Sequence, residues 1–366
     1  MIAVGAIAAI LGLTAACGGL SNNSASSSVA PAASTGVSAG TDATATGIAA
    51  ATSFLAEYNA PPTALGIDTP LSRTPDAGKT LALLQTPEPI SKTKYEATAI
   101  AAEALGWEVK IDQGVDGIAI GGVPRSIYDA QLKAAKDKGI FVVQDSTTDA
   151  ATNGVTAVID GSTQVDTWGQ MNAVWITADS RGSGNVMVFN IGEYPILSVW
   201  ADGLNAGLAE WCPGCTVTNI DIRANDLVTV RVANLVAVEL RRIPDAQYAM
   251  FAIGGLTAGV QAAMDAGGIT GVKLGGESPD APNIAALKSG TEALWTGFPT
   301  DVLGWRIADA FARAFNGDDL TPANDSLLPT QILTQENIAT APLNDSGTYI
   351  GFPDYVNAFT KLWLLR

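Results

Sequence analysis

From Thr80 onward, short apolar and β-branched segments alternate with longer amphipathic segments, and this alternation constrains the fold more than any other feature of the sequence. Strands are expected at 80–84, 117–120, 140–144, 185–191, 216–222, 248–253, 272–275 and 293–296, and helices at 92–105, 126–138, 164–178, 196–211 and 227–242. Strands that alternate with helices form parallel sheets. The sequence therefore predicts an α/β fold.

The number of strands exceeds what one doubly wound sheet holds comfortably. A break near Asp160 divides them into two groups of similar size. We therefore expect two doubly wound parallel-sheet lobes.

The segment 107–111 has the composition of a strand but lies close to the strand that begins at Gly117. A parallel crossover takes about a dozen residues or more, and the room between the two segments is too short for a helix. The segment is therefore predicted to be an irregular or edge strand that does not pair with its successor through a helical crossover.

The N-terminal region has the pattern of an export signal. An apolar run at 2–16 is shorter than the ~20 residues of a spanning helix, and small residues precede Cys17. This pattern resembles the lipobox of bacterial lipoproteins, which implies a signal peptide at 1–17 and acylation of Cys17. The alternative is a buried N-terminal helix with an incidental cysteine. Residues 18–52, rich in Ser, Ala, Thr and Gly, are predicted to be a low-complexity flexible tether.

The charge and the absent residue types exclude several functions. The net charge is −16 with 20 Lys and Arg residues, so nucleic acid is not expected as a partner. The sequence has no histidine, which excludes His-based catalytic triads and His-ligated metals. We expect no enzymatic activity, no catalytic residue, no cofactor and no metal.

Several segments in order resemble the type I periplasmic binding proteins, the ribose and galactose class of sugar-binding lipoproteins of ABC importers. The resemblance is carried by residues 114–120, 138–143, 246–252, 328–331 and 355–363. It implies hinge crossings near Asp160, Gly297 and Pro329, with a first lobe at 53–160, a second at 161–297, and a return to the first lobe with a C-terminal extension at 298–366. It also implies a monomer that is exported, anchored by lipid to the outer face of the cytoplasmic membrane, and partnered with an ABC permease.

Ligands of parallel α/β sheets bind just beyond the carboxyl ends of the strands. This rule and the resemblance together predict a ligand site formed by Gln85, Thr86, Glu88, Asp145, Glu193, Tyr194, Asn225, Asp226, Glu277 and Phe298. Asp145 and Glu277 stand near positions where the family offers acidic residues. The alternative for each polar residue is a helix cap or an exposed loop.

The predicted ligand is a small polar molecule, and carbohydrate is the favoured class. Polyols and nucleoside-like or aromatic molecules remain open. Two other functions also remain: a sensor that presents its closed form to a membrane receptor, and a glycoside hydrolase that uses two of Glu88, Asp145, Glu193 and Glu277.

Cys212 and Cys215 form a Cys-x-x-Cys motif. The motif follows a predicted helix, whereas a redox-active cysteine starts one, so no helix N-terminus lowers the thiol pKa. In an oxidising compartment, the motif predicts a structural disulfide between these two cysteines.

Overall fold

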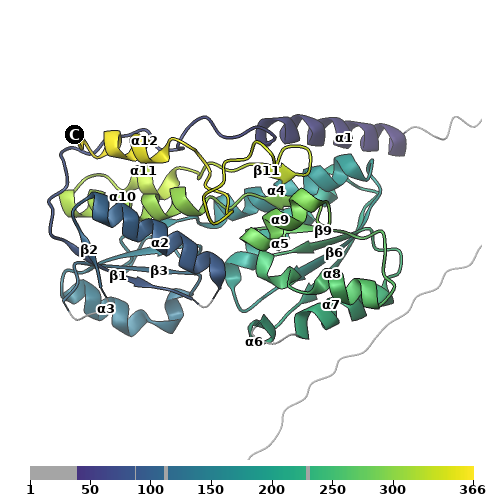
Figure 1. Ribbon diagram of the computed structural model, residues 1–366, viewed down its shortest axis with the longest axis horizontal. Helices are drawn as coiled ribbons and strands as arrows, with labels where there is room; N and C mark the ends of the chain where they lie inside the picture. The colour runs from purple at the N-terminus through teal and green to yellow at the C-terminus, as the bar shows by residue number, and fades with distance from the viewer. Residues whose placement is uncertain (1–38, 87, 111–113, 228–230) are drawn as a thin grey trace, which may run out of the picture. The chain divides into compact units, whose positions relative to one another are not determined.

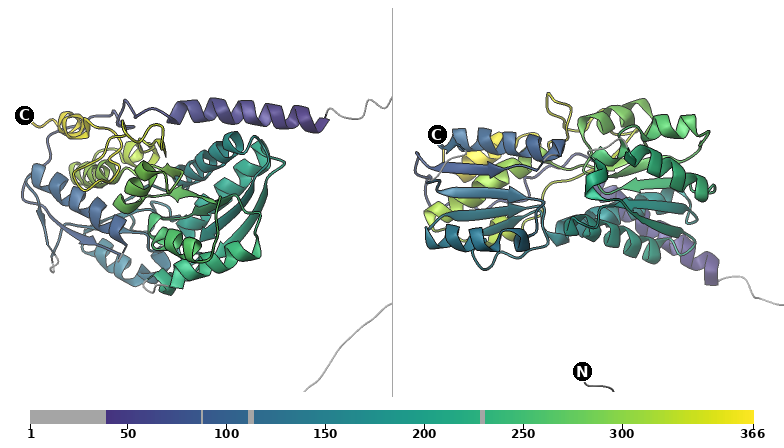
Figure 2. Two further views of the ribbon diagram at one scale, coloured as in Figure 1. Left: turned by 45° about the vertical axis from the view of Figure 1, so that its right-hand side comes forward. Right: turned by 90° about the horizontal axis from the view of Figure 1, so that it is seen from below.

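The computed structural model describes residues 39–86, 88–110, 114–227 and 231–366, and residues 39–366 form one compact unit. Two sheets organise this unit, and Figure 2 shows them side by side with helices around each. The α/β fold with two parallel-sheet lobes is confirmed.

The first sheet has the strand order β2-β1-β3-β4-β5, and all its pairs are parallel. Its strands are β1 (Thr80–Leu84), β2 (Glu108–Val109), β3 (Gly117–Gly121), β4 (Phe141–Asp145) and β5 (Ala157–Ile159). Alternate residues face opposite sides: Ala119 and Val143 join the main core, whereas Val142 and Val158 pack with Leu132. The helices of this lobe are α2 (Pro89–Ala104), η1 (Arg125–Ile127), α3 (Asp129–Asp137), α10 (Thr300–Asn316) and α11 (Thr321–Asp325).

The second sheet has the order β11-β10-β9-β8-β6-β7, in which β11 alone of the described strands is antiparallel to its neighbour. Its strands are β6 (Asn185–Asn190), β7 (Thr216–Asp221), β8 (Tyr248–Phe251), β9 (Lys273–Glu277), β10 (Leu294–Thr296) and β11 (Ile332–Thr334). Its helices are α4 (Ser162–Asp179), α5 (Pro195–Trp211), α6 (Ala224–Leu227), α7 (Arg231–Arg242), η2 (Gly254–Thr257), α8 (Val260–Ala266) and α9 (Ala281–Ser289). In this lobe α4 packs on α5, and α7 packs on α8 (Figure 1).

Between β5 and β11 the chain passes from one lobe to the other three times. It leaves the first sheet after β5, returns after β10 to form α10, which packs on α2, and leaves again after α11 to form β11. These passages fall at the expected positions near Asp160, Gly297 and Pro329. The last helix, α12 (Tyr355–Leu362), then packs on α10, where Trp305 stacks on Trp363.

The prediction of an edge strand near Trp107 is confirmed. The two-residue strand β2 pairs with β1 alone among the described strands, at the outer edge of the sheet. Val109 and Gly117 both pair with Leu81, so β3 begins at the level where β2 ends. No long return path is needed, so β2 and β3 can be joined without a crossover helix.

The predicted tether is wrong for residues 39–52, because they form part of the helix α1 (Ala39–Tyr58). This helix packs on α4 and α5: Ala51 is fully buried, and the ring of Phe54 lies 5.7 Å from that of Trp211. A Cβ on Gly47 would lie 2.2 Å from the Trp211 carbonyl oxygen, so the small residue permits this close approach. Alanine favours helix but is also common in low-complexity segments, so composition alone does not distinguish the two here. Residues 1–38, including Cys17, lie outside the described residues.

The segment after α1 runs from the second lobe to the first. The Asn59 carbonyl accepts hydrogen bonds from Gln331 and Asn337 beside the third crossing, at 2.9 and 3.1 Å. The Leu65 carbonyl then accepts one from Arg306, which is buried in α10. These bonds connect the two lobes beside the covalent crossings. No helix within the described residues has the length and apolar character needed to span a membrane.

Other differences from the sequence prediction are local. Strand β5 was missed because it has only three residues. The helix expected at 126–138 is divided into η1 and α3, and the one at 227–242 contains α7 and the last residue of α6, with 228–230 outside the described residues. The predicted disulfide between Cys212 and Cys215 is present at the end of α5.

Candidate functional site

A cavity of about 90 Å³ lies between the carboxyl ends of the two sheets. One water molecule needs ~10–15 Å³ by this measure, so the cavity has room for several. The lining residues come from both lobes and are Thr86, Glu88, Ile90, Ser91, Lys94, Gly121, Gly122, Ser146, Asp160, Val165, Trp168, Tyr194, Ile196, Leu197, Ile253, Glu277, Ser278 and Phe298.

The first-lobe wall is built around Asp145, the last residue of β4, which is fully buried. Its carboxylate pairs with the ammonium of Lys94 and accepts a 2.8 Å hydrogen bond from Tyr95, both on α2. A Cβ on Gly121 would lie 2.4 Å from Asp145 Oδ1, so the carboxylate occupies the space that a side chain on β3 would take. Lys94 thereby reaches the cavity as one half of a buried ion pair.

Asp160 lies where the chain first leaves the first sheet, and its side chain is hydrogen-bonded to Ser146. Ser146 Oγ lies 3.1 Å from Asp145 Oδ1 and 2.8 Å from Asp160 Oδ2. A hydroxyl has one proton to donate, so Ser146 can donate to one of the two carboxyl groups at a time. Burial raises the pKa of Asp160 to about 7; the Ser146 hydrogen bond opposes this rise and the charge of Asp145 adds to it.

The second-lobe wall presents Glu277, the last residue of β9, which is 2% exposed. Its Oε2 accepts a 2.8 Å hydrogen bond from Ser278. Burial raises the pKa of Glu277 well above its usual range; the Ser278 hydrogen bond lowers it, and the charge of Asp160 raises it further. The charge of Asp160 therefore acts on Glu277 across the junction of the two lobes.

Three residues that line this cavity have positive backbone φ angles although they are not glycine. The angles are 51° at Ser146, 58° at Asp160 and 52° at Ser278. Such conformations cost free energy and concentrate at functional sites. Each residue follows a strand directly, so the strained backbone turns its side chain toward the junction of the lobes.

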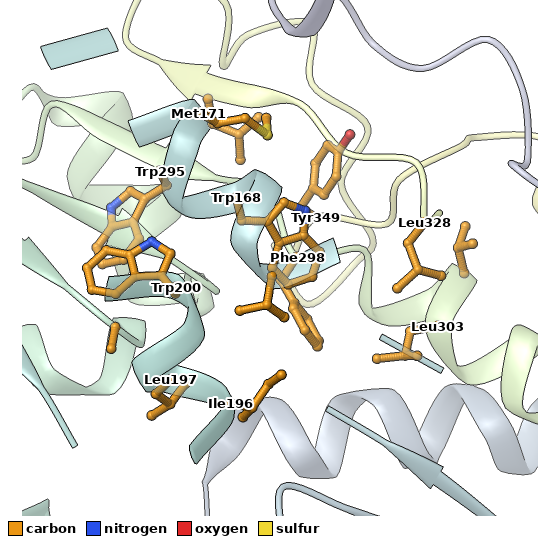
Figure 3. Packing of buried hydrophobic residues seen from close by; sticks show 14 of the residues in the cluster. Trp168, Met171, Ile196, Leu197, Trp200, Trp295, Phe298, Leu303, Leu328 and Tyr349 are labelled. Carbon is orange, nitrogen blue, oxygen red and sulfur yellow. The ribbon is translucent and has the colours of Figure 1, made fainter. Parts of the chain in front are cut away.

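Aromatic and aliphatic side chains form the remaining wall. Trp168 on α4 and Phe298 after β10 make an edge-to-face contact with ring centroids 5.5 Å apart. Figure 3 shows these two rings together, with Ile196 and Leu197 of α5 below them. The cavity therefore combines buried acids with ring faces.

A hydrogen bond crosses between the lobes at the mouth of this cavity. Tyr194, at the start of α5, donates to Glu88, at the start of α2, at 3.2 Å. Burial and the Glu88 carboxylate raise the pKa of Tyr194, so the phenol remains a donor at neutral pH. The two lobes are held in contact on this side.

A second cavity of about 330 Å³ adjoins the first and shares Glu88, Ile90, Ile253 and Ser278 with it. Its own residues include Gly254 and Gly255 after β8 and Asp280 before α9. The Asp280 side chain caps α9 and has a pKa raised by burial to about 6. The two cavities form one connected cleft.

The structure brings together part of the predicted site. Thr86, Glu88, Tyr194, Glu277 and Phe298 line the first cavity. Asp145 does not line the cavity itself, but it forms an ion pair with Lys94, which does.

Gln85, Glu193, Asn225 and Asp226 are absent from the lining of both cavities. Gln85 is exposed at the end of β1. Glu193 accepts a hydrogen bond from the backbone of Ala224, and Asn225 and Asp226 follow β7. β7 is an edge strand of the second sheet, and in the segment that follows it Leu227 lines the second cavity, whereas Asn225 and Asp226 do not.

Sequence reasoning missed Lys94, Asp160, Trp168 and several apolar lining residues. Asp160 follows a strand directly, so the carboxyl-end rule would have found it had β5 been recognised. Lys94 shares the buried face of α2 with Ala97, Thr98 and Ala101, and a charge on such a face was a usable signal. No signal marked Trp168, because a buried aromatic on a helix is ordinary. Within the described ranges, no group of three His, Cys, Asp or Glu residues could hold a metal ion.

Neither a protein-family model nor a curated protein sequence matches the chain. Its structure is similar to that of GanP, a glucose-galactose binding protein from Geobacillus stearothermophilus, with a TM-score of 0.62 and 16% identity over 72% of this chain and 99% of GanP. It is also similar to an ABC transporter solute-binding protein from Burkholderia graminis in complex with D-arabinose (TM-score 0.62, 20% identity, 72% of this chain and 98% of the other). A third is an ABC transporter solute-binding protein from Bacillus halodurans with bound myo-inositol (TM-score 0.61, 17% identity, 72% and 97%). The chain has the fold of type I periplasmic binding proteins.

Proposed function

We propose that this protein is a solute-binding protein that captures a small polyhydroxylated molecule, a sugar or a polyol, between its two lobes. The observation that carries the proposal is the cavity whose walls come from the strand ends of both sheets. A molecule that contacts both walls binds best when the lobes are closed, so its binding free energy favours hinge closure.

The chemistry of the walls suits such a molecule. Carboxyl groups and the Ser hydroxyls at 91, 146 and 278 can accept and donate hydrogen bonds to ligand hydroxyls, and the rings of Trp168 and Phe298 can cover the apolar face of a sugar ring. Three similar structures contain D-arabinose, myo-inositol or allitol, which supports this ligand class.

We propose that the protein acts without cofactor or catalysis, as a monomer, and delivers its solute to an ABC permease. The similar proteins with ABC transporter names support this role. Export and lipid anchoring at Cys17 on the outer face of the cytoplasmic membrane rest on the sequence pattern of residues 1–17. Metabolic labelling with an alkyne fatty acid should label the native chain and fail to label Cys17→Ser; equal labelling of both would contradict the anchor.

A thermal-shift screen of the purified protein against sugars, polyols, nucleosides and aromatic acids tests solute capture. A ligand that binds the folded protein raises its free energy of unfolding by mass action, by ~2.7 kcal/mol at a ligand concentration 100 times the Kd. This stabilisation is seen as a rise in Tm. The shift should disappear in Glu277→Ala and persist in Glu193→Ala, an acid outside both cavities. No shift with any sugar or polyol would contradict the ligand class, and turnover of a chromogenic glycoside would contradict the non-enzymatic role.

A further inference from the structure

Acidic side chains outnumber basic ones in the connected cleft. The carboxyl groups that line its two cavities are those of Glu88, Asp160, Glu277 and Asp280. Among the described lining residues, Lys94 is the one cationic side chain, and neither cavity is lined by an arginine. Lys94 is already paired with the buried carboxylate of Asp145. The carboxylate of Asp145 therefore already neutralises the charge of Lys94.

Asp160 and Glu277 consequently form no ion pair in the described part of the chain, although the charge of Lys94 lowers the pKa of Asp160 to a small extent. Asp160 is 6% exposed and lines the first cavity, yet its Oδ1 has no hydrogen-bond partner. Glu277 is 2% exposed and receives a hydrogen bond from Ser278. Burying a carboxylate without a counter-ion costs several kcal/mol, and the raised pKa of both acids reflects this cost. A cation bound between the two acids would stabilise their carboxylate forms.

A neutral sugar supplies hydroxyl groups to these acids but no charge. A protonated amine supplies both hydrogen-bond donors and the missing charge, and charge-assisted hydrogen bonds are roughly twice as strong as neutral ones. The rings of Trp168 and Phe298 beside the acids also favour a cation over a neutral group.

We propose that the solute is a polyhydroxylated molecule with a protonated amine, such as an amino sugar or an aminocyclitol, and that Asp160 and Glu277 bind its ammonium group. This inference deepens the proposed function and rests on it. The ammonium lies between the two lobes, hydrogen-bonded to the carboxylate at the end of β5 and to the one at the end of β9. It therefore stabilises the closed arrangement of the lobes.

Matched ligands test the inference by isothermal titration calorimetry of the purified protein at neutral pH. The pairs are D-glucosamine with D-glucose, D-galactosamine with D-galactose, and an aminoinositol with myo-inositol, and the N-acetylated sugars serve as neutral controls of similar shape. At least one amine should bind about tenfold or more tightly than its neutral partner, the range expected when a buried charge pair is completed. Equal or tighter binding of the neutral partners overturns the amine but leaves sugar capture standing. Failure of every ligand to bind overturns both.

Two isosteric variants test the residues. Asp160→Asn and Glu277→Gln should each weaken binding of the amine about tenfold or more and leave binding of its neutral partner within about threefold. Glu193→Gln is the control, since this acid lies outside both cavities and should bind the amine like the native protein. Far-ultraviolet circular dichroism and Tm confirm that each variant is folded. Equal losses for charged and neutral ligands in Asp160→Asn and Glu277→Gln would show that these acids do not recognise charge, and would overturn the inference.

Discussion

Replacement of Asp160 by asparagine is expected to stabilise the unliganded protein above neutral pH. The pKa of Asp160 is about 7 in the folded protein and 3.8 in its ordinary state. This difference corresponds to a loss of about 4 kcal/mol of stability when the buried group ionises, as an upper limit. The amide oxygen can still accept the hydrogen bond from Ser146, and the neutral amide needs no counter-ion, so the variant avoids most of this loss.

The sign of the pH dependence follows from the raised pKa. Between about pH 4 and pH 7 the folded protein binds a proton at Asp160 that the unfolded chain has released, so this group lowers the free energy of unfolding as the pH rises. Its contribution is most favourable near pH 4 and is fully lost above pH 7. The variant should therefore match the native protein near pH 4 and exceed its stability by about 2–4 kcal/mol near pH 8.

Urea unfolding of both proteins from about pH 4 to pH 8, with the change in free energy taken at each pH, measures this difference. Asp202→Asn, which alters an exposed acid on α5, is the control and should show no pH-dependent difference of comparable size. A difference that is constant with pH, or an Asp160→Asn protein that is less stable near pH 8, would refute the reasoning, because Asp160 would then be stabilised as a carboxylate.

Three further predictions concern the hinge and the core. Tyr194→Phe removes the hydrogen bond across the cleft and should weaken solute binding by ~1 kcal/mol in calorimetry with Tm nearly unchanged; unchanged affinity would contradict a role in closure. Arg313→Leu leaves the buried carboxylate of Asp309 without its 2.7 Å partner and should lower the free energy of unfolding by ~3–5 kcal/mol in urea, whereas a loss below 1 kcal/mol would contradict the ion pair. Cys212→Ser removes the disulfide to Cys215 and should cost ~2 kcal/mol of stability, as expected for so short a loop, with solute affinity retained; lost affinity in a folded variant would contradict a purely structural role.

The fold was predictable because the period of the hydrophobic pattern reports directly on helices and parallel strands. Strand β1 and most second-lobe elements lie within one or two residues of their predicted bounds. The expected edge position of β2 followed from chain length alone, since too few residues separate it from Gly117 for a helix. The helix α1 was not predicted, because its stability depends on packing of small residues such as Ala51 against the second lobe, and that contact has no local signature.

The candidate site was predictable only in part. The carboxyl-end rule locates loops correctly, so it found Glu277 and Tyr194, but it does not report which loops of a sheet face the other lobe. It also does not report which residue of a loop faces the cleft: after β7, Leu227 lines the second cavity, whereas Asn225 and Asp226 do not. Asp160 was recognised as a crossing and not as a lining residue, because the three-residue strand before it is too short for its pattern to be read.

The most direct test of solute capture is a crystal structure of the protein with the solute that gives the largest thermal shift. The solute should lie between the two sheets, within hydrogen-bond distance of Asp160 and Glu277. Its apolar face should contact the rings of Trp168 and Phe298. The hydrogen bond from Tyr194 to Glu88 should be present in the complex. A solute bound on the outer face of one lobe, with the cleft between the sheets unoccupied, would contradict capture between the lobes.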